Sequence, residues 1–424
     1  MKHEEELEKD HIWKILIPED PYDDVRFRKY CSDLLKLIEN FIAQQVYEEK
    51  TITRADYLLE AIKKRKLNRF YSGTVKEIHR TFEQTTHRSS EFYLNQFLIS
   101  KSKDAYESEF DRSIKRNIEE INEYLNQFFF SEKLRYYCTV LDQKYTKTYS
   151  YDLKFIQEVI DHIEKNDYSH IPSISVYYQV FLALHNDQNL DHYYKLKDLL
   201  EKNGLKFPQE EAVKMYEFAT NYCIDKINKG DQKFQRELFD LYKDIINKEI
   251  LLLEGMLSPW YFRNIITIAL RLGENEWTEQ FILQYKDKLP EEMKKNAVTY
   301  NLAQVYFYQK RYDDVKVLLQ EVEFDDFSYN LNSKAMLLAI YYETDEIEPL
   351  FSHFESFRTY LNRHKDIPSD RRQNYANLIK FTKKLTKIIP GDKKAIQKLK
   401  QELEVTKNVV SRNWLLQKVA ELDN

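Results

Sequence analysis

Glycine and proline are scarce in this sequence, which has 6 glycines and 9 prolines among its 424 residues. Average proteins contain roughly 7% glycine and 5% proline, and the tight turns of β-rich and doubly wound folds depend on these two residues. The shortage argues against both fold classes. It favours helices that are joined by short polar turns.

Long apolar runs are missing as well. No stretch approaches the ~18 apolar residues of a membrane-spanning helix, and residues 1–6 are too acidic for a signal peptide. The three cysteines, Cys31, Cys138 and Cys223, are odd in number and widely spaced, unlike a disulfide framework. We therefore expect a cytoplasmic protein whose cysteines are buried as small apolar side chains.

Neither sign of charge is in large excess. The chain has 65 Lys and Arg against 70 Asp and Glu, and this net charge of −5 gives no global argument for a nucleic-acid or membrane partner. Hydrophobic residues make up 42%, including 32 Tyr and 25 Phe, which is ample for a core. Because the chain exceeds the size of one core, it must divide into domains or grow by repetition.

The common sequence motifs of enzymes are absent. The sequence contains no Gly-x-Gly-x-x-Gly, no Walker-type Gly-Lys-Ser/Thr, no Gly-x-Ser-x-Gly and no His-Glu-x-x-His. Its scattered glycines cannot form a phosphate-binding loop, and its histidines are spaced too widely to share a metal ion. We expect a protein that is not an enzyme, with no catalytic residue, metal, cofactor or small-molecule substrate.

Apolar residues recur at spacings of three and four along most of the chain, as in amphipathic helices. The first long helix is expected to open at Pro21 and to carry a broad apolar stripe from Val25 to Val46. From about residue 152, short turns separate helices of similar length, which predicts antiparallel hairpins. Ser258 followed by Pro259 predicts a helix start with the hydroxyl as N-cap.

A repeat is visible after residue 258. A shift of 35 residues superposes four pairs: Leu302 and Leu337, Tyr306 and Tyr341, Tyr312 and Ile347, Val315 and Leu350. An earlier copy lies about 37 residues upstream, at Ile265, Ala269, Thr278 and Ile282. Because one hairpin cannot bury its apolar faces alone, the recurring large residues indicate hairpins that stack on one another.

In residues 300–322, Leu302 and Tyr306 would face inward on a first helix, Tyr312 would open a second, and Leu319 and Val322 would close it. This order resembles a tetratricopeptide repeat, most clearly over residues 258–357. The resemblance implies an all-α fold, wound as a right-handed α-α superhelix of antiparallel hairpins; a generic α-solenoid is the alternative. Larger residues replace the family's small ones, with Ile266, Ala303 and Leu338 at its glycine position and Thr278, Val315 and Leu350 at its alanine position.

We expect four regions along the chain. These are an N-terminal helical region at 1–150, degenerate hairpins at 151–257, tetratricopeptide-like repeats at 258–366, and basic helices at 367–424 that cap the solenoid. The helical prediction for residues 1–150 depends on periodicity alone, since the repeat does not extend to them.

The resemblance also implies a peptide groove on the first helix of each hairpin. It maps the groove onto Arg263, Asn264, Tyr300, Asn301, Gln304, Phe307 and Tyr308. These side chains suit backbone amides and aromatic packing, although the aromatic ones could instead pack against an adjacent helix. The lysines and asparagines of a carboxylate clamp are missing at several matching positions, so a chaperone C-terminus is not expected as ligand.

Basic residues concentrate in residues 358–400, with 13 Lys or Arg against three Asp. Lys380, Lys383, Lys384 and Lys387 recur at helical spacing and form one face. That face could meet nucleic-acid phosphate, an acidic partner, or acidic stretches of this chain such as 321–326 and 343–348.

The preferred hypothesis is a scaffold that holds a peptide or helix of a partner protein. The alternative is a helical-repeat protein that binds nucleic acid or an acidic partner through residues 358–400.

Overall fold

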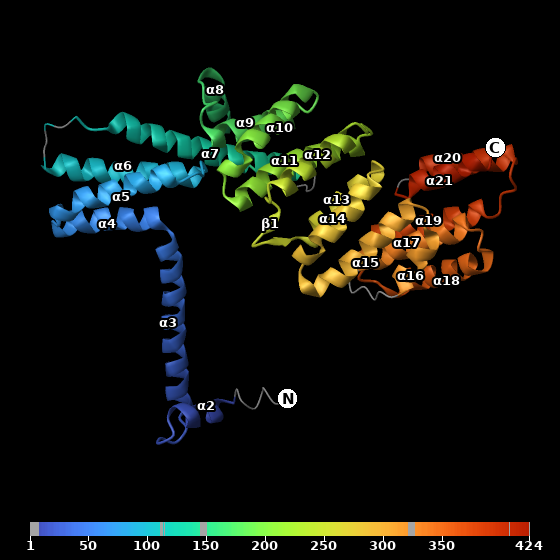
Figure 1. Cartoon of the computed structure of the whole chain (residues 1–424), viewed down its shortest axis with the longest axis horizontal. Helices are drawn as coiled ribbons and strands as arrows, with labels where there is room; N and C mark the ends of the chain where they lie inside the picture. Colours follow the sequence, from blue (N-terminus) through green and yellow to red (C-terminus); the bar gives the residue numbers. More distant parts are fainter. Residues whose placement is uncertain are drawn as a thin grey trace. The chain divides into compact units, whose positions relative to one another are not determined.

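The computed structural model describes residues 8–110, 113, 115–144, 151–320, 327–406 and 408–423 (Figure 1). In this part of the chain there are 20 α-helices, three short 3-10 helices and one hairpin of two-residue strands. The all-α fold predicted from the sequence is confirmed. None of the helices in the described ranges is both long and apolar enough to cross a bilayer.

The chain divides into two compact units, Met1–Tyr222 and Cys223–Asn424, and each is described by itself. Their boundary falls inside helix α11 (Gln209–Asn228). The finer division expected at residues 150, 257 and 366 stays a prediction.

In the first unit, successive helices pack on one another. They are α2 (Lys9–Leu16), α3 (Asp24–Glu49), α4 (Thr51–Arg65), η1 (Asn68–Phe70), α5 (Tyr71–Gln84), α6 (Ser90–Phe110), α7 (Ile118–Lys144), α8 (Ile156–Lys165), α9 (Pro172–His185), α10 (Leu190–Asn203) and η2 (Gly204–Lys206). Helix α7 packs against α6, α8 and α9, and its buried residue Phe130 contacts the rings of His162 on α8 and of Tyr168.

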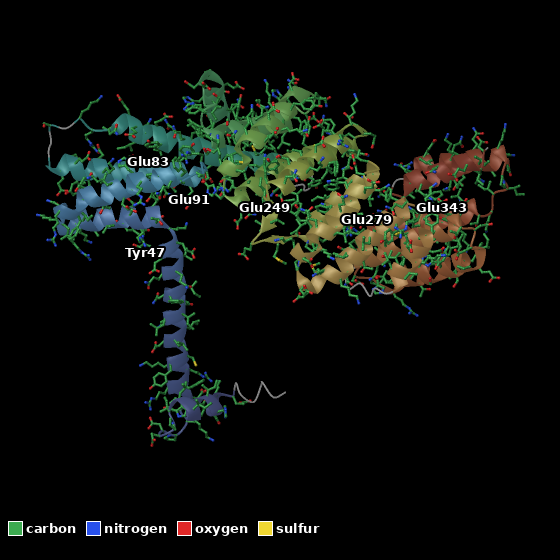
Figure 2. The ribbon with its side chains drawn as sticks, in the orientation of Figure 1. Tyr47, Glu83, Glu91, Glu249, Glu279 and Glu343 are labelled. Atoms are coloured by element: carbon green, nitrogen blue, oxygen red, sulfur yellow. The ribbon has the colours of Figure 1, made fainter. Side chains whose placement is uncertain are left out.

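Helix α3 is exposed along most of its length. Phe27 is its buried residue, and Figure 2 shows side chains standing out along the helix, with Tyr47 labelled near its end. The helix begins at Asp24 and not at Pro21, because the Asp23 side chain accepts hydrogen bonds from the first free backbone N–H groups. Cys31 lies exposed on α3, so the expectation that it is buried was wrong, whereas Cys138 and Cys223 are buried.

The second unit contains the predicted hairpins. Its elements are α12 (Phe234–Asn247), β1 (Leu252–Leu253), β2 (Met256–Leu257), α13 (Pro259–Arg271), α14 (Asn275–Tyr285), η3 (Lys286–Lys288), α15 (Glu291–Tyr308), α16 (Tyr312–Gln320), α17 (Phe327–Glu343), α18 (Ile347–Arg363), α19 (Ser369–Leu385), α20 (Lys393–Val405) and α21 (Arg412–Glu421). As predicted, Pro259 opens α13 and the Ser258 hydroxyl accepts from the N–H of Trp260.

Neighbouring helices in this unit pack in a regular order. Helices α13, α15 and α17 each pack against the helix that follows, and α13, α15, α17 and α19 also pack against one another in turn. This packing is compatible with a helical repeat. Figure 1 shows helices α13 to α19 in yellow to orange.

The same turn closes three successive hairpins. Gly273, Lys310 and Asp345 all adopt a left-handed backbone, with φ of 78°, 60° and 55°. The N–H that follows each of them donates to a carbonyl five residues earlier, at 2.8 to 3.0 Å. These bonds are those of a Schellman C-cap. They recur after 37 and then 35 residues, which are the offsets found in the sequence repeat.

The larger residues that replace the small residues of a tetratricopeptide repeat are fully buried. Ile266, Ala303 and Leu338 on the first helices are each 0% exposed. Thr278, Val315 and Leu350 on the second helices are also 0% exposed. Leu302 and Tyr306, predicted to face inward, are only half-buried, while Ala303 and Val305 beside them are buried. Val322 and the acidic stretch 321–326 lie outside the described residues.

Candidate functional site

The predicted groove residues lie on α13 and α15 but do not share one exposed surface. Tyr300 and Asn301 are 1% and 0% exposed, so they belong to the core of the second unit. Phe307 is half-buried, and its ring lies 5.9 Å from that of Tyr312 on α16. Asn264 and Tyr308 are exposed, the latter at 47%. Helical spacing places these side chains on a helix, but it does not say which of them neighbouring helices cover.

Arg263, from the middle of α13, lies beside aromatic rings of the next two first helices. Its guanidinium carbon is 6.0 Å from the centre of the Tyr329 ring on α17. The Tyr329 ring in turn meets that of Tyr300 on α15 edge to face, at 4.8 Å between centres. A guanidinium over an aromatic face is attracted by the ring's negative charge density. The three side chains therefore form a continuous cluster across three helices.

Polar groups from α17 and α19 complete this arrangement. The Tyr375 hydroxyl on α19 donates to Oδ1 of Asn332 on α17 at 2.5 Å. The Tyr300 hydroxyl accepts a hydrogen bond from Nε2 of Gln304 at 3.1 Å. We call Arg263, Tyr300, Tyr329, Asn332 and Tyr375 the Arg263 cluster. It brings together residues of α13, α15, α17 and α19.

Burial keeps the hydroxyl groups of Tyr300 and Tyr375 neutral. Burial raises the pKa of Tyr300 well above its usual value, and the positive charge of Arg263 opposes this shift. Burial also raises the pKa of Tyr375, again against Arg263. Both tyrosines therefore stay protonated at neutral pH. They can donate or accept a hydrogen bond, but they cannot neutralise the guanidinium.

Two side chains in this region, Arg263 and Gln304, have a polar group for which the described residues supply no carboxylate or hydrogen-bond donor. Within the described ranges, Arg263 forms no ion pair with any carboxylate. Oε1 of Gln304 is shielded from solvent and accepts no hydrogen bond from the residues that the structure describes. A guanidinium that lies on an aromatic ring, without a carboxylate partner among the described residues, suits a ligand that brings a carboxylate, whereas the Gln304 acceptor is closed off from any ligand.

Sequence reasoning found Arg263, Tyr300 and Gln304 but missed Tyr329, Asn332 and Tyr375. The 35-residue shift places Ala335 at the position of Tyr300, and this small residue suggested no aromatic contact there. The ring that contacts Tyr300 comes instead from Tyr329, six residues before Ala335 in α17. The sequence repeat gave no signal for this contact.

The four lysines of the predicted basic face are not equivalent in the structure. Nζ of Lys383 lies 3.2 Å from Oε1 of Glu355 on α18, and Lys384 forms an ion pair with Glu402 on α20. The hydrogen bond from Lys384 holds the pKa of Glu402 below its usual value. Lys380 and Lys387 are exposed. Two of the four charges are thus balanced within the chain.

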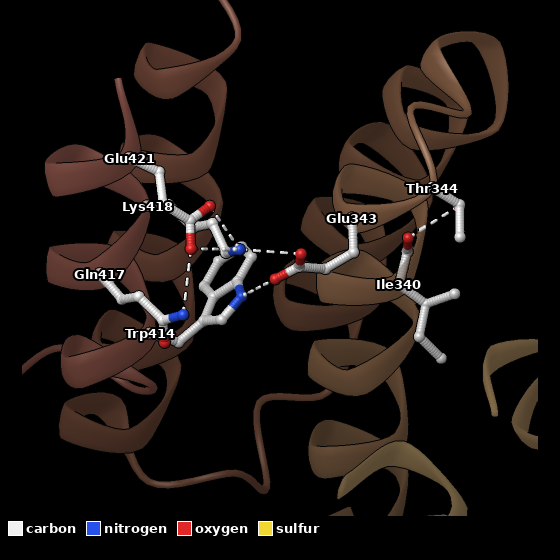
Figure 3. A network of polar contacts seen from close by, with 7 residues as sticks. All are labelled: Ile340, Glu343, Thr344, Trp414, Gln417, Lys418 and Glu421. Atoms are coloured by element: carbon white, nitrogen blue, oxygen red, sulfur yellow. Dashed lines mark hydrogen bonds and ion pairs between the residues drawn. The ribbon is translucent and has the colours of Figure 1, made fainter. Parts of the chain in front are cut away.

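The last helix is attached to α17 by a network of polar contacts (Figure 3). The Glu343 carboxylate accepts from Nε1 of Trp414 at 2.7 Å and from Nζ of Lys418 at 2.8 Å. Nζ of Lys418 also donates to Glu421 at 2.7 Å, and the Lys418 side chain is 9% exposed. Burial lowers the pKa of Lys418, but hydrogen bonds to Glu343 and Glu421 outweigh it and hold the pKa above its usual value.

A polar cavity of about 400 Å³ lies between α5, α6 and α7 in the first unit. Two of its charged groups have partners: Asp104 accepts from the neighbouring Arg116 at 2.6 Å, and Nζ of Lys103 lies 3.3 Å from Nε2 of His79. The hydrogen bonds from Arg116 hold the pKa of Asp104 below its usual value. Since these charges already have partners, the cavity gives a weaker basis for ligand binding than the Arg263 cluster.

Comparison of the chain with protein-family models, with curated proteins and with solved structures finds no match. Any assignment of function therefore depends on the geometry of the chain itself.

Proposed function

We propose that this protein is a non-enzymatic scaffold that holds an extended segment of a partner protein against the faces of α13, α15, α17 and α19. In this proposal, residues 258–366 form tetratricopeptide-like hairpins wound as a right-handed superhelix. The recurring Schellman turns and the packing of alternate helices support the repeat. A cytoplasmic location belongs to the same proposal.

The observation that carries the proposal is the half-buried guanidinium of Arg263, for which the described residues supply no carboxylate. An arginine held on an aromatic surface is pre-organised to bind a carboxylate through two parallel hydrogen bonds. We therefore propose that the partner segment contributes an Asp or Glu side chain to Arg263.

A selection from a random peptide library against the whole purified chain tests this proposal. We expect enriched peptides to share an acidic residue, and binding to fall at least tenfold in Arg263→Gln. Arg271→Gln is the matched control, because Arg271 is an exposed arginine on the same helix. Enriched peptides without an acidic residue, or equal losses in the two variants, would remove Arg263 from the proposed site.

The alternative, nucleic-acid or acidic-partner binding through residues 358–400, stays a prediction that no contact favours. Only Lys380 and Lys387 of the predicted face lack a carboxylate partner in the described residues. Its test is a salt titration with single-stranded and duplex oligonucleotides, because binding through phosphates must weaken steeply as salt increases. No measurable affinity at low salt would exclude the nucleic-acid form of this alternative.

A further inference from the structure

Helix α3 carries the largest set of exposed apolar side chains on any one described helix. Seven of them, each 46% to 66% exposed, lie between residues 34 and 46: Leu34, Leu35, Leu37, Ile38, Phe41, Ile42 and Val46. Leu34, Ile38 and Phe41 follow the alternating four and three spacing of a coiled-coil seam, and the others flank it. A helix with such a face is normally packed against another helix.

Helix α2 covers the N-terminal end of this helix. Trp13 of α2 is 1% exposed, and its ring packs against Phe27 and stacks on Tyr30 of α3. The indole Nε1 donates to the carbonyl of Asp20 at 2.9 Å, and Arg26 pairs with the Asp20 carboxylate at 2.6 Å. These contacts fix α2 on the first two turns of α3. Among the residues that the structure describes, none covers the face from Leu34 to Val46 in this way.

We propose that the face of α3 from Leu34 to Val46 pairs with the same face of a second copy of this chain, with the two helices antiparallel. The charges along the helix support this occupant. Residues 24–36 contain four basic and two acidic residues, whereas residues 37–49 contain three acidic residues and no basic one. An antiparallel pair that places Leu34 beside Val46 brings Glu48 and Glu49 of each helix to residues 32 and 31 of the other, about one turn from Arg28 and Lys29, and it also opposes the helix dipoles favourably.

The size of the face also suits a pair of identical helices. At roughly 80 Å² for each half-exposed apolar side chain, mutual burial removes about 600 Å² per copy, which reaches the lower end of the ~1,200–2,000 Å² of a specific interface. A two-fold pairing needs only one such surface, because the same patch serves both copies.

Sedimentation of the full-length chain at micromolar concentration tests the proposal. We expect twice the mass of one chain, and a single-chain mass for the variant Ile38→Glu/Phe41→Glu with an unchanged circular dichroism spectrum. Both side chains are exposed in the single chain, so the variant should fold. Val405→Glu, an equally drastic change at a 78% exposed site, should remain dimeric. A monomeric wild type, or a variant that still dimerises, overturns the proposal.

The exposed thiol of Cys31 distinguishes the two possible helix directions. Antiparallel pairing of Leu34 with Val46 brings Cys31 of one copy beside residues 48 and 49 of the other, so Glu48→Cys or Glu49→Cys should form an intermolecular disulfide with Cys31 under mild oxidation. The wild type should not cross-link, because the two Cys31 thiols of an antiparallel pair lie far apart along the helices, one on each side of the two-fold axis. A disulfide between the two Cys31 residues of the wild type would instead indicate a parallel pair and contradict the proposed arrangement.

Discussion

Nζ of Lys418 lies 2.8 Å from a carboxylate oxygen of Glu343, although the two residues are 75 positions apart in the chain. The contact joins α21 to the end of α17, next to the hydrogen bond between Trp414 and the same carboxylate. It therefore fixes the final helix of the second unit to α17. Because the lysine is largely buried, its charge depends on the two carboxylates that surround it, Glu343 and the more exposed Glu421.

Replacing Glu343 with Gln should lower the free energy of unfolding by about 1–2 kcal/mol, since the Lys418 ammonium then keeps only the more exposed Glu421 as its carboxylate partner. The double variant with Lys418→Met should recover part of this loss. Urea denaturation followed by tryptophan fluorescence measures both effects. As control, Glu355→Gln, which removes the exposed partner of Lys383, should cost no more than about 0.5 kcal/mol. Equal costs at the two sites would contradict the importance given to the Glu343 contact.

Stability should fall when the pH drops below the usual pKa of histidine. Burial lowers the pKa of His353, and the charge of Lys334 adds to this shift, although the hydrogen bond to the Lys334 carbonyl opposes it. A group whose pKa is lower in the folded chain binds more protons when unfolded, so its stabilising contribution is lost as the pH falls from about 6.5. We expect the urea midpoint to decrease between pH 7.5 and 5.5, and to decrease less in His353→Gln. An unchanged pH slope in that variant would assign the effect to other groups.

Substitutions at the left-handed turn residues Lys310 and Gly273 should change the stability of the chain in opposite directions. Lys310 has φ of 60°, which costs a residue with a side chain roughly 1–2 kcal/mol relative to glycine, so Lys310→Gly should stabilise by about 1 kcal/mol. Gly273→Ala at the equivalent turn should destabilise by about 1 kcal/mol. A Cβ at Gly273 meets no atom within 4 Å, so only the backbone conformation is tested. Thermal unfolding of both variants measures the difference, and changes of the same sign would contradict the shared turn.

The equivalent core positions of successive hairpins should differ in what they tolerate. Ala303→Leu adds volume to a fully closed site and should cost about 1–3 kcal/mol through overpacking. Ile266→Ala at the preceding repeat removes volume and should cost about 2–4 kcal/mol through a cavity. Chemical denaturation gives both values. A neutral Ala303→Leu would mean that neighbouring hairpins are less closely packed than these contacts indicate.

Local patterns in the sequence predicted much of the second unit. The 3.6-residue period indicated helices, the offsets of 37 and 35 residues matched the recurring turns, and Ser258 with Pro259 marked the start of α13. These properties depend on residues close together in the chain, so they are readable without tertiary contacts.

The sequence did not predict which helix faces are covered. Tyr300 and Asn301 were expected to line a groove but lie in the core, whereas Cys31 was expected to be buried but is exposed. Lys383 pairs with Glu355, which is 28 residues away in the chain, and Lys384 pairs with Glu402, which is 18 residues away. Periodicity defines a face of a helix, but only the packing of neighbouring helices decides whether that face meets protein or solvent.

Hydrogen exchange of the full chain, with and without a peptide selected for binding, tests the proposed scaffold function most directly. Binding to the Arg263 cluster should slow amide exchange in α13, α15, α17 and α19, because a ligand that spans these helices suppresses their local opening. The slowing should disappear in Arg263→Gln and persist in Arg271→Gln. Slower exchange confined to α3, or to the lysine-rich residues 380–400, would contradict the central proposal that the chain holds its partner on the first helices of its hairpins.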